Sequence, residues 1–572
     1  MDKQTIPFIV LCILLMVFWG PIMDWVWPPK PAAHPPRADR VSTVSQTNET
    51  ALPSLPPTPG TLSRLAKAEA SIPPQTATLE NDRMRVEFTN LGGGIGRVIL
   101  KQFSENGGGV VVLNDQSPFP LMSAVAGDAA WCDPYQWTVS SNQLHAVYQS
   151  PAGLQISKEY TLEPDYQISA RLTLKNAGRA AFSNATLQVA LGMSGPLDAR
   201  DQGDFIGLSF LSGNKAFHET VATLQKQAAK QQKPFEKIQP IEWAAVRNQF
   251  FTILTTPSTP FAAIQAEPFA LTPRPEPDAV KSPYGVLALI HSTPFQLAPG
   301  ASTNWTFAIY AGPKEYQKLS SLGKRQDQVL DFGMFEIFCK ALLWLMGLFH
   351  GVFHNWGVAI LVVTVVIKIL FWPLTAMSTK SMKQMQALAP QMNALKEKYK
   401  DNPKKMNEET MKMYRDYKIN PMAGCLPMVV QIPIFIAFYN LLRTAIELRG
   451  APFILWIRDL SAPDTVAYLP GTGFPINPLP LIMSATMIWQ TKLTPQAPNT
   501  DPSMKMMMWF MPAMFLFFCY NFSSGLSLYW TAQNLLTILQ TYLTKNKSAP
   551  PPQKVKSGGG FTFCRPVETR KK

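Results

Sequence analysis

Hydrophobic and polar positions follow a period of two over residues 76–320. Runs such as "RMRVEFTN" and "YQISARLTLKN" alternate or cluster β-forming residues, and turn signals such as "LGGGIG" and "KNAG" separate them. Many short strands with one helical or flexible interruption, "ETVATLQKQAAKQQK", predict a β-sandwich domain. His145, His218 and His291 are isolated in this region, so no catalytic set is indicated.

The period changes after residue 333, where long apolar runs alternate with basic loops, as in a helical membrane bundle. The run from Met334 to Thr375 would measure about 60 Å as one helix, twice the hydrocarbon thickness of a bilayer. We therefore expect two elements: an amphipathic helix over 334–349 in the outer membrane interface, and a membrane span over 356–374.

Four more spans are expected within 422–543, and an apolar run within 1–27 predicts a further one. The alternative for 1–27 is a cleaved signal peptide, but the run is long, ends in tryptophans and lacks a small-residue cleavage site. A proline-rich linker over 28–75 leads to the sandwich. The predicted fold is thus a six-span α-helical bundle with an N-terminal anchor, a five-span core and a large extracytoplasmic β-domain.

Residues 376–421 are polar and basic, with ten Lys and Arg against five Asp and Glu. Apolar residues recur every three or four positions on both sides of the turn at 401–403, which predicts an antiparallel helical hairpin with a methionine-rich seam. These methionines either meet varied apolar partners or fill gaps in helix packing. They include Met382, Met385, Met392, Met406 and Met411.

The formal charge of +14 is explained mainly by topology, because loops rich in Lys and Arg belong in the cytoplasm. The hairpin and the basic tail over 544–572 then lie inside, together with both termini, and the sandwich lies outside. This distribution weakens a nucleic-acid-binding interpretation, and no specific nucleic-acid sequence is expected as a partner.

Lys368 lies inside the apolar stretch "GVAILVVTVVIKILFWPLT", where a lysine costs about 2.5–3.5 kcal/mol on insertion scales. It could snorkel to the inner headgroups. However, polar residues lie in several spans while no Asp or Glu lies in the core of any span. We therefore predict a wet, positively charged cavity open to the cytoplasm; helix–helix packing is the alternative. The residues concerned are Thr364, Thr375, Gln431, Ser527, Trp530, Thr531, Gln533, Asn534 and Thr541.

The chain lacks a P-loop, a dinucleotide fingerprint and an HExxH motif, so neither ATP use nor bond cleavage is indicated. Its six scattered cysteines form no metal-binding spacing, and we expect no metal, no cofactor and no catalytic residues. Two other classes stay open. One is a solute transporter with Lys368 as its anion site, although no internal repeat is detected. The other is an envelope enzyme whose sandwich binds glycan.

The sequence closely resembles the bacterial YidC-type membrane protein insertases over nearly its whole length. The specific signals are "FWPLT" after the buried cation, "KINPMAGCLPMVVQIPIFIAFYNLL", "ELRGAPFILWIRDLSAPD" and "SSGLSLYWTAQN". The resemblance implies an inner-membrane, ATP-independent insertase and chaperone that moves hydrophobic segments of new membrane proteins into the bilayer. It also implies nascent membrane proteins and the Sec translocon as partners, and a basic tail that touches the ribosome.

The resemblance also implies roles for individual residues. Lys368 takes the place of the groove cation, which is often arginine in the family and is not equivalent to lysine. Thr364, Gln431, Ile432 and Trp530 fall at groove-lining and substrate-contacting positions, with tyrosine common in place of Trp530. The hairpin over 376–421 would receive the substrate. Ser527 and Asn534 join the expected groove on the pattern of polar residues described above.

Overall fold

The computed structural model describes residues 74–104, 109–197, 203–231, 233–271, 284–400, 402–417, 419, 426–493 and 502–545. The chain forms two compact units. The β-unit runs to Gly333 and includes Arg443–Glu447, whereas the helical unit contains Met334–Leu442 and the chain from Leu448 onward. The anchor predicted over 1–27, nearly all of the linker over 28–75, and the tail beyond Lys545 lie outside the described residues.

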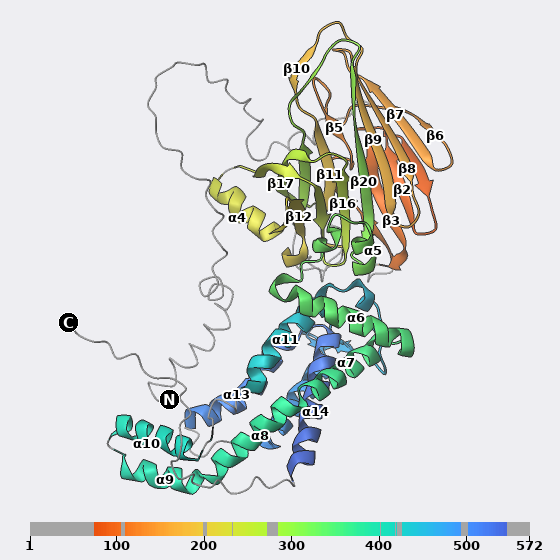
Figure 1. The fold of residues 1–572 in the computed structure, drawn as a ribbon. Helices are drawn as coiled ribbons and strands as arrows, with labels where there is room; N and C mark the ends of the chain where they lie inside the picture. The colour runs from red at the N-terminus through yellow and green to blue at the C-terminus, as the bar shows by residue number, and fades with distance from the viewer. Residues whose placement is uncertain are drawn as a thin grey trace, which may run out of the picture. The chain divides into compact units, whose positions relative to one another are not determined.

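The β-unit is built from antiparallel sheets (Figure 1). The nine-stranded sheet has the order β13 (Lys215–Thr220), β12 (Gly207–Ser212), β15 (Trp243–Arg247), β16 (Phe251–Pro257), β20 (Ser302–Pro313), β9 (Gln167–Asn176), β8 (Leu154–Leu162), β7 (Gln143–Gln149), β6 (Gln136–Val139). The five-stranded sheet has the order β14 (Phe235–Ile241), β17 (Phe261–Ala270), β18 (Tyr284–His291), β11 (Gln188–Ser194), β5 (Ala124–Val125).

Smaller elements complete the β-unit. A four-stranded sheet contains β1 (Thr76–Glu80), β2 (Met84–Thr89), β3 (Gly94–Ser104) and β4 (Val110–Leu113), and β10 (Phe182–Ala185) pairs with β19 (Phe295–Leu297). Two helices, α4 (Val221–Gln231) and α5 (Tyr316–Ser321), lie beside the sheets. The helix α4 confirms the helical interruption predicted from the sequence.

Alternation along the strands produces the core of the β-unit. In β9, Ile168, Leu172 and Leu174 are buried, while Ser169 and Arg171 between them point to the opposite face. The five-stranded sheet packs on the nine-stranded one through contacts of β11 with β15 and β16. This arrangement confirms the β-rich domain that the period of two predicts.

A buried lysine joins β8 to two loops of the β-unit. The Lys158 ammonium donates hydrogen bonds to the carbonyls of Gly92 (2.6 Å) and Met122 (2.9 Å), and it lies 4.6 Å from the centre of the Tyr135 ring. Gly92 has φ = +76°, and a Cβ there would lie 2.4 Å from the Ser123 hydroxyl. The turn that accepts the ammonium therefore requires glycine.

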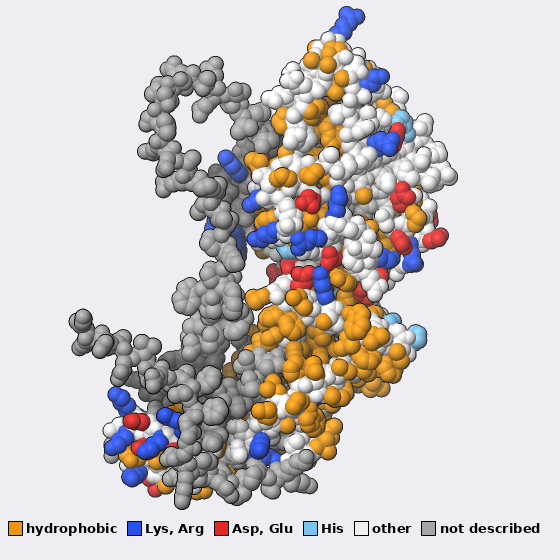
Figure 2. Space-filling view, viewed as in Figure 1, with side chains coloured by type: hydrophobic (Ala, Val, Ile, Leu, Met, Phe, Trp, Pro, Cys, Tyr) orange, Lys and Arg blue, Asp and Glu red, His pale blue; other side chains and the backbone are white. Residues whose placement is uncertain are grey.

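The helical unit contains α6 (Glu336–Phe353), α7 (Trp356–Leu370), α8 (Trp372–Ala387), α9 (Ala389–Lys398), α10 (Pro403–Asp416), α11 (Leu426–Thr444), α12 (Pro478–Leu493), α13 (Pro502–Cys519) and α14 (Ser524–Lys545). A short hairpin of β21 (Ala467–Tyr468) and β22 (Pro475–Ile476) lies between α11 and α12. Figure 2 shows hydrophobic side chains gathered over much of this unit.

The helix expected over 356–374 ends at Leu370, and α8 begins at Trp372. The two axes differ by 59°, since Pro373 in the first turn of α8 has no amide hydrogen with which to continue α7. Among the described residues, one helix, Gly333–Phe353, is both long enough and apolar enough to cross a membrane. The bent pair of α7 and α8 meets the same criterion when the two helices are taken together. By length and composition, α6 could therefore be a membrane span, and it could equally be the interfacial helix expected over 334–349.

The segment expected to form a two-helix hairpin contains three helices, because Pro390 in the first turn of α9 interrupts the helix and separates α9 from α8. Met385 and Met392 are buried, and Met382 packs against the cluster of Met385, Leu388 and Ile419. Met406 is half-buried and Met411 is exposed. Of the five methionines, Met385 and Met392 therefore fill space between helices, whereas Met411 presents its side chain outward.

A close approach at the start of α7 gives a stability prediction. A Cβ on Gly357 would lie 2.1 Å from the Phe453 ring, so Gly357→Ala should lower the free energy of unfolding by about 1–3 kcal/mol through overpacking. In α6, a Cβ on Gly351 would meet no atom within 4 Å, so Gly351→Ala should leave the free energy of unfolding unchanged or raise it slightly. Thermal unfolding of the detergent-solubilised chain measures both, and equal melting temperatures would contradict the packing argument.

Candidate functional site

Lys368 lies in the last turn of α7 and is only 6 % exposed. Its ammonium donates a hydrogen bond to the Thr537 hydroxyl of α14 at 2.8 Å, and Thr537 in turn donates to the Gln533 carbonyl at 2.7 Å. Within the described part of the chain, Lys368 forms no ion pair with a carboxylate. A hydrogen bond to a charged group contributes about 1.5–3 kcal/mol, so Thr537 offsets much of the burial cost but leaves the positive charge uncompensated.

Polar side chains extend from this lysine along the neighbouring helices. The Gln533 amide donates to the Gln431 side-chain oxygen of α11 at 3.0 Å, and the Gln431 amide donates to the Tyr529 hydroxyl at 2.6 Å. Further along α14, Gln540 donates to the Thr375 hydroxyl of α8 at 2.6 Å. We call this set the polar seam; it consists of Lys368, Thr375, Gln431, Tyr529, Gln533, Thr537 and Gln540.

The polar seam follows from spacing on α14. Tyr529, Gln533, Thr537 and Gln540 are separated by four, four and three residues, which places them on one helix face. Gln533 is among the polar residues that the sequence pattern placed in the cavity, whereas Tyr529, Thr537 and Gln540 were not predicted. Their signal in the sequence is the spacing of four, four and three positions, which forms a polar stripe separate from the one through Asn534.

Several predicted groove residues have partners elsewhere. Asn534 donates to the Met483 carbonyl (3.3 Å) and the Thr486 hydroxyl (3.1 Å) of α12, which makes it a helix-packing contact. Thr364 is fully buried, and its hydroxyl donates to the Ile360 carbonyl of its own helix at 2.6 Å. Ser527 is also buried, and its carbonyl accepts the Thr531 hydroxyl. In this structure these three side chains are not joined to Lys368.

The remaining two predicted residues lie beside the polar seam. The Trp530 ring meets Phe435 of α11 edge-on at 4.7 Å between centroids and Phe515 of α13 at 5.1 Å. Ile432 follows Gln431 on α11 and is 37 % exposed. Trp530 therefore fastens three helices by aromatic packing, while Ile432 presents an apolar side chain at the surface next to a seam residue.

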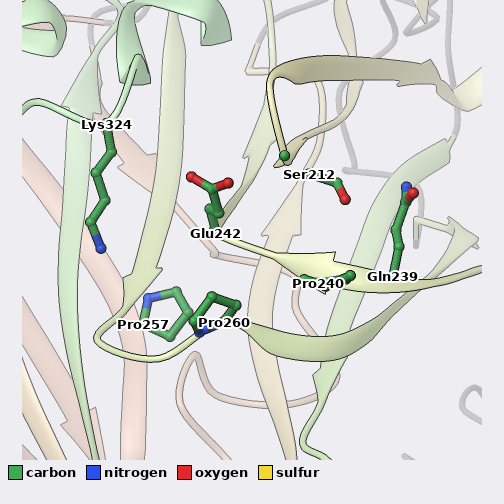
Figure 3. Close-up of a pocket in the computed structure, with 8 residues that line it drawn as sticks. Ser212, Gln239, Pro240, Glu242, Pro257, Pro260 and Lys324 are labelled. Carbon is green, nitrogen blue, oxygen red and sulfur yellow. The ribbon is translucent and has the colours of Figure 1, made fainter.

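Two surface pockets in the described part of the β-unit bear on the envelope-enzyme alternative. One, of about 410 Å³, is lined by Ser212, Gly213, Gln239, Pro240, Glu242, Pro257, Pro260 and Lys324 (Figure 3). Another, of about 660 Å³, includes Glu159 and Arg171, which form an ion pair at 3.6 Å. Each lining contains a single carboxylate, Glu242 or Glu159, and acid–base glycan chemistry commonly uses a pair. Neither pocket therefore supports the envelope-enzyme alternative.

These features define a class: a membrane protein with a helical unit, a buried cation without an acidic partner in the described chain, and a large β-domain. Two family models match it, "60Kd inner membrane protein" over residues 348–551 and "YidC periplasmic domain" over residues 76–345. The chain belongs to the YidC family of inner-membrane insertases, which confirms the family that the sequence resembles.

Curated relatives match most of the chain. A membrane protein insertase YidC from Geotalea daltonii is 31 % identical over 569 residues, covering 96 % of this chain and 100 % of the relative. That of Geobacter sulfurreducens is 33 % identical and covers 80 % and 83 %. Among solved structures, an active YidC insertase with its first transmembrane domain resolved is 17 % identical, with a TM-score of 0.34 and coverage of 85 % and 97 %.

Proposed function

We propose that this chain inserts hydrophobic segments of new membrane proteins into the bilayer by way of the polar seam, with Lys368 as the group that attracts the substrate. The observation that carries this proposal is the buried Lys368 ammonium, bonded to one neutral hydroxyl and without a carboxylate partner in the described chain. An acidic residue in a substrate's short polar end would supply the missing counter-charge.

The driving force comes from the substrate and the membrane rather than from ATP. Amide and hydroxyl groups of the polar seam lower the cost of carrying a short polar end part-way across. The attached apolar segment of about 20 residues then moves sideways into lipid, which removes its surface from water. The membrane potential adds about 2.3 kcal/mol per charge per 100 mV for an acidic end that moves outward.

The segment from α8 to α10 is proposed to receive substrates on the cytoplasmic side. Exposed Met411 and half-buried Met406 on α10 provide soft apolar contacts among lysines, and the neighbouring Lys412 is exposed. This assignment requires the orientation predicted from charge: six spans, cytoplasmic termini and a periplasmic β-unit. The Sec translocon and, through the basic tail, the ribosome are proposed partners.

Reconstitution of the purified full chain tests the proposed function. Proteoliposomes without ATP or any other protein should insert a single-span substrate with a short acidic end, measured as a protease-protected fragment several-fold above empty liposomes. A substrate with a long, highly charged end serves as the control and should not insert. Failure to insert the first substrate, together with lysine-dependent flux of small anions, would instead favour the transporter alternative.

A further inference from the structure

The loop between α11 and α12 carries an apolar tip in a strained conformation. Leu455 has φ = +56° and a side chain that is 82 % exposed, and its neighbour Ile454 is 54 % exposed. The left-handed region is unfavourable for leucine, whose Cβ crowds the following carbonyl oxygen. Among the described residues nothing covers the two side chains, so the conformation is not explained by packing within the chain.

Hydrogen bonds hold this tip in one shape. The Phe453 amide donates to the Ile457 carbonyl at 3.0 Å, and the Ile457 amide returns a bond to the Ile454 carbonyl at 3.2 Å. At the base of the loop, the Leu460 amide donates to the Ala451 carbonyl at 3.0 Å. Such cross-links over-determine the backbone, which is how a strained residue persists.

The tip is fastened to the outer end of α7. Asn355 caps that helix by accepting the Val358 amide at 3.0 Å, and its side-chain amide donates to the Phe453 carbonyl at 3.2 Å. The Phe453 ring packs on Gly357, where a Cβ would clash. On the other side of Asn355, α6 ends with Val352 and Phe353, which are 65 % and 49 % exposed. The apolar tip therefore continues an apolar surface of the helical unit.

We propose that Ile454 and Leu455 insert into the outer leaflet at the boundary between headgroups and acyl chains, and that this anchor fixes the depth of α7. The occupant is lipid rather than protein because the tip continues the apolar surface of α6. In addition, exposed Arg458 lies three residues beyond Leu455, where its guanidinium can meet a lipid phosphate. The proposal requires the outward-facing orientation of this loop assumed above.

Anchoring at this point sets where Lys368 lies in the membrane. Lys368 follows Asn355 by thirteen positions, which corresponds to about 20 Å along α7. In a hydrocarbon core of about 30 Å, the Cα of Lys368 then lies about 10 Å from the inner edge. The loop thus fixes the depth of Lys368 in the membrane.

Fluorescence quenching in proteoliposomes tests the anchor independently of insertion activity. In a full chain with its native cysteines replaced, Leu455→Cys carries an environment-sensitive dye, and Asn304→Cys, an exposed position of β20, is the water-facing control. We expect strong quenching at Leu455 by a nitroxide near the lipid headgroup, and iodide quenching at least fivefold weaker than at Asn304. Equal iodide quenching would overturn the proposal, and so would protection from both quenchers, which indicates a protein cover.

A second variant tests whether the tip sets the depth of α7 in the membrane. Leu455→Gly removes the apolar side chain and relieves the left-handed strain, so the loop should fold at least as well. A dye at Ile369, which is exposed on α7, reports the depth of the helix. We expect its quenching to move from one nitroxide depth to another when Leu455→Gly is added. An unchanged profile would contradict the assigned role, whatever the insertion activity of the variant.

Discussion

Lys368→Ala should reduce insertion of a short substrate with an acidic end at least tenfold, while Lys368→Arg should retain most of it and Lys368→Glu should retain almost none. The reason is electrostatic, because a unit charge pair 4 Å apart contributes about 4 kcal/mol at an effective dielectric constant of 20, and a tenfold effect requires only about 1.4 kcal/mol. The measurement is the protease-protected fraction in depleted membranes, at matched expression of each variant.

Two comparisons separate charge attraction from a structural role of Lys368. A substrate with a neutral end should respond to Lys368→Ala much less than the acidic one. Lys340→Ala removes an equally long cation whose partner is Glu336 at 2.6 Å on α6, and it should leave insertion unchanged. If all Lys368 variants insert the acidic substrate equally well, the lysine only snorkels, and the polar seam plays no part for that substrate.

Lys158→Met should destabilise the β-unit, and the loss should grow with pH. Burial lowers the pKa of Lys158 from 10.5 to about 7 in the folded chain. Between those values the unfolded chain binds more protons than the folded one, so this group makes the folded state more stable as pH rises. Below pH 7 both states are protonated, and its contribution no longer depends on pH.

The loss of stability expected for Lys158→Met is large. Methionine keeps the apolar stem but removes both hydrogen bonds to the carbonyls of Gly92 and Met122, at a cost of about 1–3 kcal/mol for each buried group left unpaired. Above pH 7 the gap between wild type and variant should widen by up to about 1.4 kcal/mol per pH unit. Denaturant unfolding of the full chain in detergent at pH 7 and pH 9 measures this difference, and parallel pH profiles would refute it.

Local patterns predicted the β-unit well, because buried and exposed side chains alternate between consecutive residues in strands such as β9. The buried lysine of α7 was also visible from its own surroundings. Its partner was not: Thr537 lies 169 residues away, and sequence periodicity says which residues share a face but not which helix that face meets. Asn534 shows the same limit, since its polar stripe turns to α12 rather than to Lys368.

The helix boundaries that the sequence analysis missed lie at single prolines, Pro373 and Pro390. Apolar residues lie on both sides of Pro373, so hydropathy alone carried the second span past the break at Phe371. The methionines illustrate a different limit. Met385 and Met411 are chemically identical, yet one is buried and the other exposed, and only tertiary packing distinguishes them.

The break at Phe371 also has a mechanical consequence. Beyond it, α8 is latched to α14 twice: Gln540 donates to Thr375, and the Lys383 ammonium donates to the Thr544 carbonyl at 2.7 Å. These two hydrogen bonds couple α8 to the last turns of α14, and the Lys368–Thr537 hydrogen bond couples α14 to α7. A displacement of α8 is therefore expected to reach the polar seam through α14 and to change the surroundings of Lys368.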